Sequence, residues 1–349
     1  MLSTIFLILS AILLILTLAP VSRHEVWWVR GWDFPRMQLF ILSIVLISIA
    51  LLLLDLEVNQ NRIVIGVNAF CIVFLGWWII PYTIFYKTEV AKVKKIEPDQ
   101  VIKIMVANVL YSNRETTRLF QMINENQPHI LVTLESNKWW EEQLNQIEHE
   151  YPFTIKQSLE NSYGMHVYSK YELLETEINF LVEDDVPSMK AYAVLPSGQK
   201  VKIHFLHPAP PSPTENEEST ERDAELLIIA KEVSKKDEPV IVTGDMNDVA
   251  WSFTTRLFRK ISGLLDPRIG RGMFSTFHAD YAIIRWPLDH LFHSYHFNVI
   301  QVSKLPHFGS DHFPILVTLQ YTHKDTNKGN GLEPTNGDKE MAKEKIEKA

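Results

Sequence analysis

The stretch VIVTGDMNDVAWS, residues 240–252, joins an apolar run to two carboxylates and an amide crowded into four positions. Residues 240–245 have the β-branched, apolar character of a buried strand. Asp245 and Asn247 lie two positions apart, so in an extended segment their side chains point to the same side. A carboxylate can hold a metal ion or orient a water, and an amide can donate to an anionic oxygen. In isolation the GDxN pattern suits a tight turn without chemistry equally well.

The chain around this stretch alternates strand-like and helix-like segments. Strands are predicted at residues 101–108, 129–135, 164–170, 191–195, 201–207, 289–294 and 312–320, and helices at 114–126, 138–150, 215–236 and 251–262. Some of the strands are apolar throughout and others alternate. This pattern predicts an α/β domain in which sheets pack on each other by one face and helices cover the opposite faces.

Polar residues stand at the ends of several predicted strands. Asn108, Glu135 and His207 each close one, and Asp311 and His312 open another. Strand ends are where α/β proteins assemble their sites, because the sheet holds the loop rigidly. A carboxylate that ends an apolar strand, such as Glu135, is costly unless it is solvated, paired or bound to a cation. Mg²⁺ commonly uses only one or two protein carboxylates, although a capping or surface role also suits Glu135 or Asn108 alone.

The pattern Asp-His occurs twice, each time beside a strand. In HFGSDHFPI, Gly309 and Ser310 provide a loop from which both Asp311 and His312 can enter one site. In WPLDHLF, Asp289 begins an apolar run, and a buried carboxylate is the usual partner that orients an imidazole. Asp289 and His312 are therefore a candidate pair, with His290 pointing elsewhere. The alternatives are two ordinary dipeptides and, for His207, a structural histidine.

The first part of the chain has the composition of a membrane anchor. Residues 2–19, 37–54 and 63–86 lack charged side chains and approach or exceed the roughly 20 residues that cross a bilayer as a helix. We predict three transmembrane helices within residues 1–95. The first could instead be a cleaved signal peptide, but nothing basic precedes it. Trp27, Trp28 and Trp32 between the first two spans have the character of an interfacial segment.

Charge suggests both the orientation of the protein and the kind of partner it meets. Basic residues flank the spans on the side of residues 96–321, which the positive-inside rule assigns to the cytoplasm. Residues 1–95 carry 8 basic and 5 acidic side chains, a net charge of +3. Because the whole chain has a net charge of −8, the rest of the chain has a net charge of −11. That balance argues against a sequence-independent nucleic-acid binder. The only cysteine, Cys71, lies in a span, so no internal disulfide is available. Residues 322–349 are polar and are predicted to be disordered.

The motifs, taken in order, carry a resemblance to a known family. They are VANVL, HILVTLES, GMHVYSK, FLHP, VTGDMND, STF, LDHLF and GSDHFPI. This order and spacing resemble the endonuclease/exonuclease/phosphatase superfamily, which includes DNase I, abasic-site endonucleases, sphingomyelinases and inositol-polyphosphate 5-phosphatases. The resemblance covers about residues 101–320 and is closest to bacterial membrane-anchored members. It implies an α/β fold, the DNase I-like four-layer α/β/β/α sandwich, here preceded by three transmembrane helices.

The resemblance also implies a metal-dependent phosphoester hydrolase, acting as a phosphodiesterase, nuclease or phosphatase on a nucleic acid, phospholipid or small phosphodiester. Its cofactor would be Mg²⁺ or Mn²⁺, held mainly by Glu135 with Asn108 and Asp311 assisting. By the same resemblance, Asp245 would orient or deprotonate the attacking water, Asn247 would hold the phosphoryl group, and His312, oriented by Asp289, would act in proton transfer. His207 would stabilise developing charge or protonate the leaving oxygen.

Two departures bear on the substrate. The W-x-G-D-x-N-x-R and P-x-W-C-D-R patterns of inositol 5-phosphatases are missing, since Val242, Thr243 and Gly244 precede Asp245. No basic stripe suited to duplex binding is visible either. The alternative from another class is a non-catalytic, membrane-anchored binding or scaffold protein that keeps the fold. A transporter or channel is disfavoured because the spans carry no internal charge. The bilayer is the expected partner, and the sequence points to no protein partner.

Overall fold

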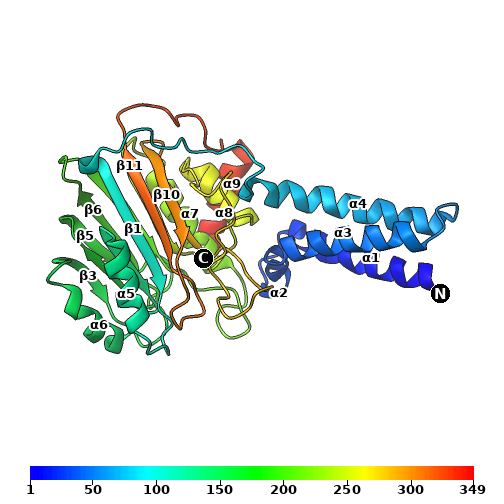
Figure 1. Ribbon diagram of the computed structural model, residues 1–349, viewed down its shortest axis with the longest axis horizontal. Helices are drawn as coiled ribbons and strands as arrows, with labels where there is room; N and C mark the ends of the chain where they lie inside the picture. The colour runs from blue at the N-terminus through cyan, green and yellow to red at the C-terminus, as the bar shows by residue number, and fades with distance from the viewer.

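The computed structural model describes residues 1–349, as a bundle of three long helices joined to an α/β domain (Figure 1). The bundle consists of α1 (Leu2–Leu18), α3 (Arg36–Leu53) and α4 (Asn59–Ile79), and each of the three helices is long and apolar enough to cross a membrane. The last span was predicted at 63–86, but α4 begins at Asn59 and ends at Ile79. The backbone continues from Ile79 as the 3-10 turn Ile80–Tyr82, so the candidate span runs over Asn59–Tyr82 and lies four residues earlier at each end than predicted.

The bundle buries a narrow apolar seam and exposes the rest of its apolar surface. Leu13, Ala50 and Val64 pack in the seam, where Asn68 Nδ2 also donates to Ser10 Oγ at 2.7 Å. Apolar side chains such as Val73 point outward and are 74% exposed. A soluble domain would bury such residues, whereas a lipid bilayer is their natural solvent. A short helix, α2 (Trp27–Arg30), lies between α1 and α3 at the end of the bundle next to the α/β domain (Figure 1).

The first sheet of the α/β domain has six strands in the order β10-β11-β1-β2-β4-β3. The strands are β1 (Val101–Asn108), β2 (Ile130–Leu134), β3 (Phe153–Gln157), β4 (Met165–Ser169), β10 (Phe297–Lys304) and β11 (Ile315–Tyr321). β1 and β2 are parallel and are joined by α5 (Thr117–Asn126). α5 and α6 (Lys138–Leu144) cover the outer face of this sheet through buried residues such as Leu119 and Trp140.

The second sheet has five strands in the order β5-β6-β7-β8-β9. They are β5 (Leu173–Asn179), β6 (Ser188–Val194), β7 (Lys200–Leu206), β8 (Val240–Asp245) and β9 (Asp289–His293). β7 and β8 are parallel and are joined by α7 (Thr220–Val233), and α8 (Phe253–Ser262) follows β8. Leu226, Leu227 and Phe258 of these helices pack on the outer face of the sheet.

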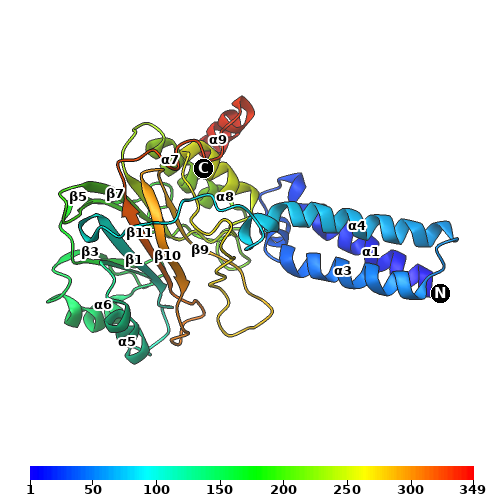
Figure 2. The same ribbon diagram turned by 45° about the horizontal axis from the view of Figure 1, so that its top comes forward.

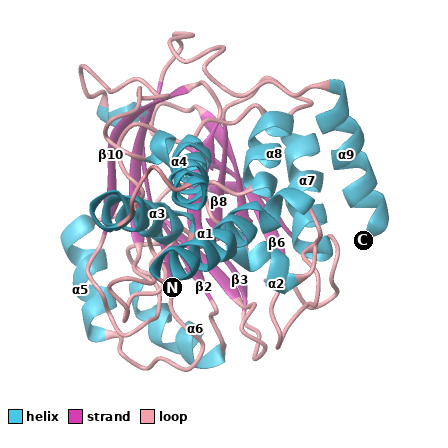
Figure 3. Ribbon diagram, turned by 90° about the vertical axis from the view of Figure 1, so that its right-hand side faces the viewer, coloured by secondary structure: helices cyan, strands magenta, loops and turns pink.

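The inner faces of the two sheets form the main core. Side chains such as Val106, Val132 and Val167 of the first sheet belong to one buried cluster with Ile203 and Phe205 of the second. Figure 3 shows α5 and α6 on one side of the strands and α7, α8 and α9 on the other. The predicted four-layer α/β/β/α sandwich is therefore confirmed. The sequence did not predict β3, β5 and β10.

The last segment of the chain differs from its prediction. Residues 322–349 were predicted to be disordered, but Asn336–Lys348 form the helix α9. Thr335 Oγ1 accepts from the backbone N–H of Asp338, whose carboxylate in turn accepts from the backbone N–H of Thr335, which makes a capping box. Ala342 is fully buried against α7 and α8, and Lys345 pairs with Asp223 at 2.8 Å. The apolar contact of Ala342 and the ion pair of Lys345 with Asp223 therefore order a segment whose composition is polar.

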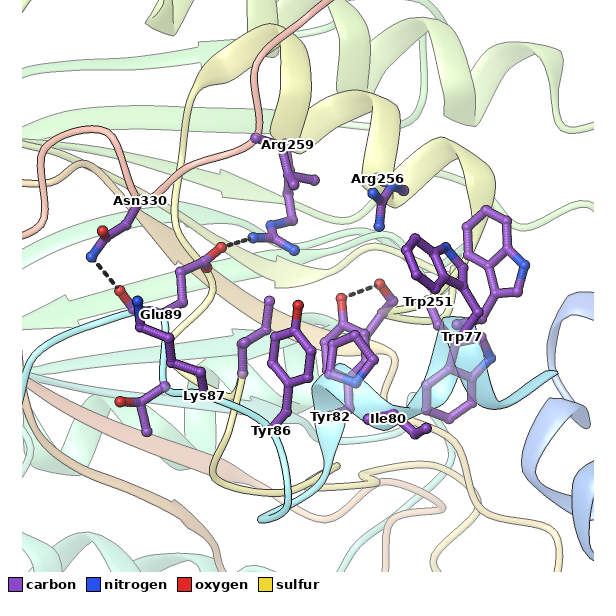
Figure 4. A pocket seen from close by; sticks show the side chains of 16 residues that line it. Trp77, Ile80, Tyr82, Tyr86, Lys87, Glu89, Trp251, Arg256, Arg259 and Asn330 are labelled. Carbon is purple, nitrogen blue, oxygen red and sulfur yellow. Dashed lines mark hydrogen bonds and ion pairs between the residues drawn. The ribbon is translucent and has the colours of Figure 1, made fainter. Parts of the chain in front are cut away.

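The helical bundle and the α/β domain meet at a cavity of about 340 Å³ (Figure 4). Tyr82, just after α4, donates its hydroxyl to the carbonyl of Ala250 at 2.6 Å. Trp251 Nε1 donates to the carbonyl of Asp33 at 2.8 Å, and Arg259 pairs with Glu89 at 2.5 Å. The segment that follows β8 therefore contacts the helical bundle at two points, just before α3 and just after α4.

Candidate active site

The two parallel strand pairs bring their carboxyl ends to one edge of the sandwich. Asn108 ends β1 and Glu135 follows β2 in the first sheet, while His207 follows β7 and Asp245 ends β8 in the second. Parallel neighbours end at the same edge, and the facing of the two sheets closes the gap between the pairs. Glu135 has a left-handed backbone with φ of 56°, which turns the chain sharply just after the strand.

Asn108 links carboxylates from both sheets. Its Nδ2 donates to Glu135 Oε1 at 2.8 Å and to Asp245 Oδ2 at 3.3 Å. The backbone N–H of Tyr111 donates to the other Glu135 oxygen at 3.2 Å. Burial raises the pKa of the Glu135 carboxyl, against the opposing effects of His207 and of the hydrogen bond from Asn108. The carboxylates of Glu135 and Asp245, one from each sheet, thus share the amide of Asn108.

His312 lies between two carboxylates of the second sheet. Its Nδ1 lies 2.8 Å from Asp289 Oδ2 and its Nε2 lies 3.5 Å from Asp245 Oδ2. Asp245 and Asp289 are directly opposite each other in the antiparallel β8–β9 pair, so both side chains project from the same face. Burial opposes charging of the His312 ring, but the two carboxylates outweigh it and raise its pKa to about 10. In that state both ring nitrogens carry a proton, and the Nδ1–H donates to Asp289.

The loop before β11 is fixed by Ser310, which the sequence indicated as part of the loop but whose hydrogen bonds it did not predict. Ser310 Oγ donates to the carbonyl of Asn108 at 2.7 Å and accepts from the backbone N–H of His312 at 3.1 Å. It therefore positions His312 relative to β1. Asp311 is half-buried on the same loop, and its carboxylate accepts only from Ser310, at 3.4 Å. The structure thus places Asp311 beside the cluster without a direct bond to it.

His207 and Asn247 complete the set from the second sheet. His207 is buried, its ring lies 5.5 Å from that of Tyr163, and its Nδ1 has no partner. Burial lowers the pKa of His207, while Asp245 and Glu135 raise it. Asn247 has φ of 49°, and its Nδ2 donates to the carbonyl of Pro208 at 3.0 Å. Its backbone N–H donates to Asp245 at 2.9 Å, as in an Asx turn.

A buried network that the sequence did not reveal supports this turn. Arg222 on α7 donates to the carbonyl of Asn247 at 2.8 Å and lies 3.6 Å from Asp248. His290 Nε2 lies 2.8 Å from the carbonyl of Asp248, so His290 points away from His312, as predicted. Arg222 carried no signal beyond its place in a predicted helix. The sequence showed a carboxylate at Asp248 but did not indicate that Arg222 would lie beside it.

The charges of the site suit a divalent cation. The carboxylates of Glu135, Asp245 and Asp289 converge, and neither lysine nor arginine pairs with any of them, so His312 is their only direct cationic neighbour. Ligand atoms of Asp245, Asp289 and His312 all lie within 4.8 Å of one another. The contacts of His312 with both aspartates account for that grouping. Glu135, next to the amide of Asn108, is the carboxylate left without a cation, and hard oxygen donors of this kind suit Mg²⁺ or Mn²⁺.

One known protein family matches the part of the chain that carries the candidate site. The family described as "Endonuclease/Exonuclease/phosphatase family" matches residues 105–312, which is more than half of the chain. The chain belongs to the endonuclease/exonuclease/phosphatase family. Family membership implies a divalent-metal-dependent phosphoester hydrolase and does not specify the substrate. No curated protein sequence matches the chain. The predicted placement in a membrane-anchored subgroup stays a prediction.

Solved structures of this family share the fold. Zebrafish TDP2, complexed with a single-strand DNA product, superposes with a TM-score of 0.53 at 16% identity, over 63% of this chain and 99% of that one. The human Nocturnin catalytic domain with a bound sulfate anion gives 0.52 at 17% identity, over 64% and 94%. An endonuclease/exonuclease/phosphatase from Beutenbergia cavernae gives 0.51 at 16% identity, over 64% and 72%. At these identities the likeness shows the fold alone.

Proposed function

We propose that this protein is a membrane-anchored phosphoester hydrolase whose site is built by Asn108, Glu135, His207, Asp245, Asn247, Asp289, Asp311 and His312. The observation that carries the proposal is the convergence of Glu135, Asp245 and His312 from both sheets: the Asn108 amide donates to both Glu135 and Asp245, and Asp245 pairs with His312. A fold kept only as a scaffold has no reason to bury Asp245 and Asp289 beside one imidazole and to set the half-buried Glu135 next to them, because each buried charge costs stability.

Glu135 is the principal ligand for the cation, Mg²⁺ or Mn²⁺, with Asn108 and Asp311 assisting. When bound, the cation polarises the phosphoryl group and neutralises its charge, which is worth several kcal/mol of barrier. The hydrogen bond from Asn108 Nδ2 at 2.8 Å fixes one Glu135 oxygen, and the Tyr111 N–H at 3.2 Å fixes the other. Two donors on one carboxylate reduce the reorganisation needed when a cation binds.

Hydrolysis replaces one phosphorus–oxygen bond by another. The oxygen of a water forms a bond to phosphorus while the bond from phosphorus to the leaving oxygen breaks on the opposite side. Asp245 orients this water and accepts its proton, because the Asn247 N–H and Asn108 amide already fix its carboxylate at 2.9 and 3.3 Å. Asn247 Nδ2 has a second hydrogen beyond the one given to Pro208, and it donates to a phosphoryl oxygen.

Two histidines act on the charge that develops on the phosphate and the leaving oxygen. His312 is held by Asp289 at 2.8 Å and contacts the phosphoryl oxygens as an imidazolium, which also serves proton transfer. His207 is buried and its Nδ1 has no protein partner. It stabilises or protonates the leaving oxygen, which then departs as an alcohol.

The test is hydrolysis of bis(p-nitrophenyl) phosphate by the full chain in detergent with Mg²⁺, before and after removal of the metal by EDTA. We expect Glu135→Ala and His312→Ala to lower kcat/KM by about 100-fold or more. Glu172→Ala and His149→Ala are matched controls because both side chains are exposed and lie outside the site. Equal activity of the wild type and both site variants would refute the enzyme and favour a scaffold.

The orientation in the membrane follows from charge. Arg23, Arg30 and Arg36 lie at the same end of the bundle as Lys87, whereas Arg62 lies at the opposite end. The positive-inside rule places the α/β domain in the cytoplasm. Part of the basic charge is neutralised, since Arg30 and Arg36 both pair with Asp33. A reporter fused after Ala349 tests this topology, and an extracytoplasmic signal would reverse it.

A further inference from the structure

The loop of residues 278–285, between α8 and β9, exposes an apolar tip. Tyr281 is 55% exposed, Ile283 is 79% exposed and Ile284 is 47% exposed. Arg285 holds the tip in shape, because its Nε donates to the carbonyl of Tyr281 at 2.7 Å and its Nη2 to that of Ala279 at 3.0 Å. Adjacent isoleucines at a structured loop tip are unfavourable in water, so the loop is built to meet an apolar phase.

The tip lies at the level where the anchor meets the membrane. Gln38, in the first turn of α3, donates its side-chain amide to the carbonyl of Ile283 at 2.8 Å. In Figure 2 the gold loop hangs from the α/β domain beside the end of α3 that faces that domain. Because α3 is one of the candidate spans, the isoleucines reach the surface of the same bilayer.

The base of this loop is part of the candidate active site. Phe277 and Trp286 pair through both backbone N–H groups, and the Phe277 ring lies 4.9 Å from that of His312. The backbone N–H of Ala279 donates to the carbonyl of Asp311 at 2.6 Å. A tip seated in the bilayer surface therefore brings His312 and Asp311 close to the lipid headgroups.

A cavity of about 470 Å³ lies between the base of this loop and the segment that joins α1 to α3. Three segments line it: the tryptophan-rich segment between α1 and α3, the proline-rich loop after His207, and Trp286, which directly follows loop 278–285. The lining includes Trp28, Trp32, Phe34, Pro211, Pro213 and Trp286. Aromatic and proline side chains with few charges suit the glycerol and upper acyl region of a lipid and offer little to a polyanion.

We propose that the substrate of this site is a phosphoester-bearing lipid of the bilayer in which the protein is anchored, and that loop 278–285 seats the site on the headgroups. This inference rests on the proposed hydrolase. Water adds across one phosphorus–oxygen bond of the headgroup, so the products are an alcohol and a phosphate monoester, or inorganic phosphate from a monoester. The net charge of −11 outside the anchor disfavours a nucleic acid.

The experiment uses the full chain in nanodiscs with Mg²⁺. Separate preparations contain phosphatidylcholine with phosphatidylglycerol, cardiolipin, sphingomyelin or phosphatidylinositol phosphate, and products are followed by phosphorus NMR. The double variant Ile283→Asp/Ile284→Asp should lower the rate on the hydrolysed lipid about tenfold or more, because seating even one isoleucine in lipid is worth about that factor. Hydrolysis of bis(p-nitrophenyl) phosphate should change less than about twofold. Ile96→Asp is the matched control, since Ile96 is 58% exposed and precedes β1.

The outcomes separate the two proposals. Turnover of the soluble diester without turnover of any lipid, or hydrolysis of a single-stranded oligonucleotide that the loop variant leaves unchanged, overturns the lipid substrate and keeps the hydrolase. Loss of lipid turnover in Ile96→Asp as well would also refute the role of the loop. A second readout does not need activity: a spin label at Ile283→Cys, in a Cys71→Ala background, should be more accessible to oxygen than to a water-soluble nickel chelate. The opposite order would overturn the seating of the loop.

Discussion

Replacing Asp289 by asparagine changes one charge behind the candidate catalytic histidine. The carboxylate is fully buried and its Oδ2 lies 2.8 Å from His312 Nδ1. Asparagine has nearly the same shape, so the backbone pairing of β9 with β8 is kept. The substitution removes the charge-assisted hydrogen bond that holds the imidazolium and leaves Asp245, at 3.5 Å, as its remaining carboxylate partner.

A hydrogen bond to a charged group contributes about 1.5 to 3 kcal/mol, which corresponds to roughly 10- to 150-fold in rate. We expect Asp289→Asn to lower kcat on bis(p-nitrophenyl) phosphate by that factor. KM should change less than about threefold, because Asp289 lies behind His312 and does not contact the substrate. Since Asp289 acts through His312, the double variant with His312→Ala should be no slower than His312→Ala alone.

The assay is initial-rate kinetics of the full chain in detergent with Mg²⁺, with thermal unfolding as a check that each variant is folded. Asp237→Asn is the matched control, because the side chain of Asp237 is 67% exposed and contacts neither the histidine nor the carboxylates of the site. A loss of kcat below threefold, or additive losses in the double variant, would show that Asp289 does not orient His312.

Three predictions concern the fold that carries the site. Burial raises the pKa of Glu225 from 4.5 to about 8, so the folded state keeps this carboxyl protonated over a pH range in which the unfolded state ionises it. The free energy of unfolding should therefore be highest below pH 4.5 and fall by roughly 4 to 5 kcal/mol as the pH rises to about 8. This fall should disappear in Glu225→Gln when unfolding is measured against pH. Gly244→Ala should prevent folding of the full chain in detergent, because a Cβ would lie 1.9 Å from the carbonyl oxygen of Leu206; a native circular dichroism spectrum with a cooperative thermal transition would contradict this. Deleting residues 336–349 should lower the midpoint of thermal unfolding by several degrees, since it uncovers the apolar contact of Ala342 and leaves Asp223 without Lys345.

The sequence predicted the polar residues at the strand ends better than it predicted the outer strands and the last helix. Asn108, Glu135 and Asp245 stand out because each is a polar residue at the end of a buried apolar run, and such a run can end only at the rim of a sheet. The contact of Asp289 with His312 was also predicted, from a carboxylate and an imidazole that each begin a segment beside a strand. At these residues the local sequence pattern, a polar side chain at the end of an apolar strand, also marks the place where the strands meet in the fold.

The missed features are those that only tertiary contacts determine. β5 is LLETEIN, exposed along most of its length at the edge of the second sheet, so its sequence has little apolar periodicity. The polar helix α9 is ordered by its capping box and by Asp223, whose acidic side chain gives no sign of the distant Lys345. Ser310 acts through the carbonyl of Asn108, and no side-chain pattern encodes a backbone partner.

Neither sheet holds a complete site. The first sheet and its loops provide Asn108, Glu135 and His312, and the second provides Asp245 and Asp289, so the chemistry depends on the apolar core that presses the two sheets together. The anchor is bound to the same place, because Tyr82 and Asp33 hold the backbone and indole of the segment that follows Asp245. In the membrane-anchored hydrolase proposed above, this link from the end of α4 to the end of β8 sets the angle at which the site meets the bilayer. That is the geometry an enzyme needs when its substrate lies in the membrane plane, and a freely tethered domain would lack it.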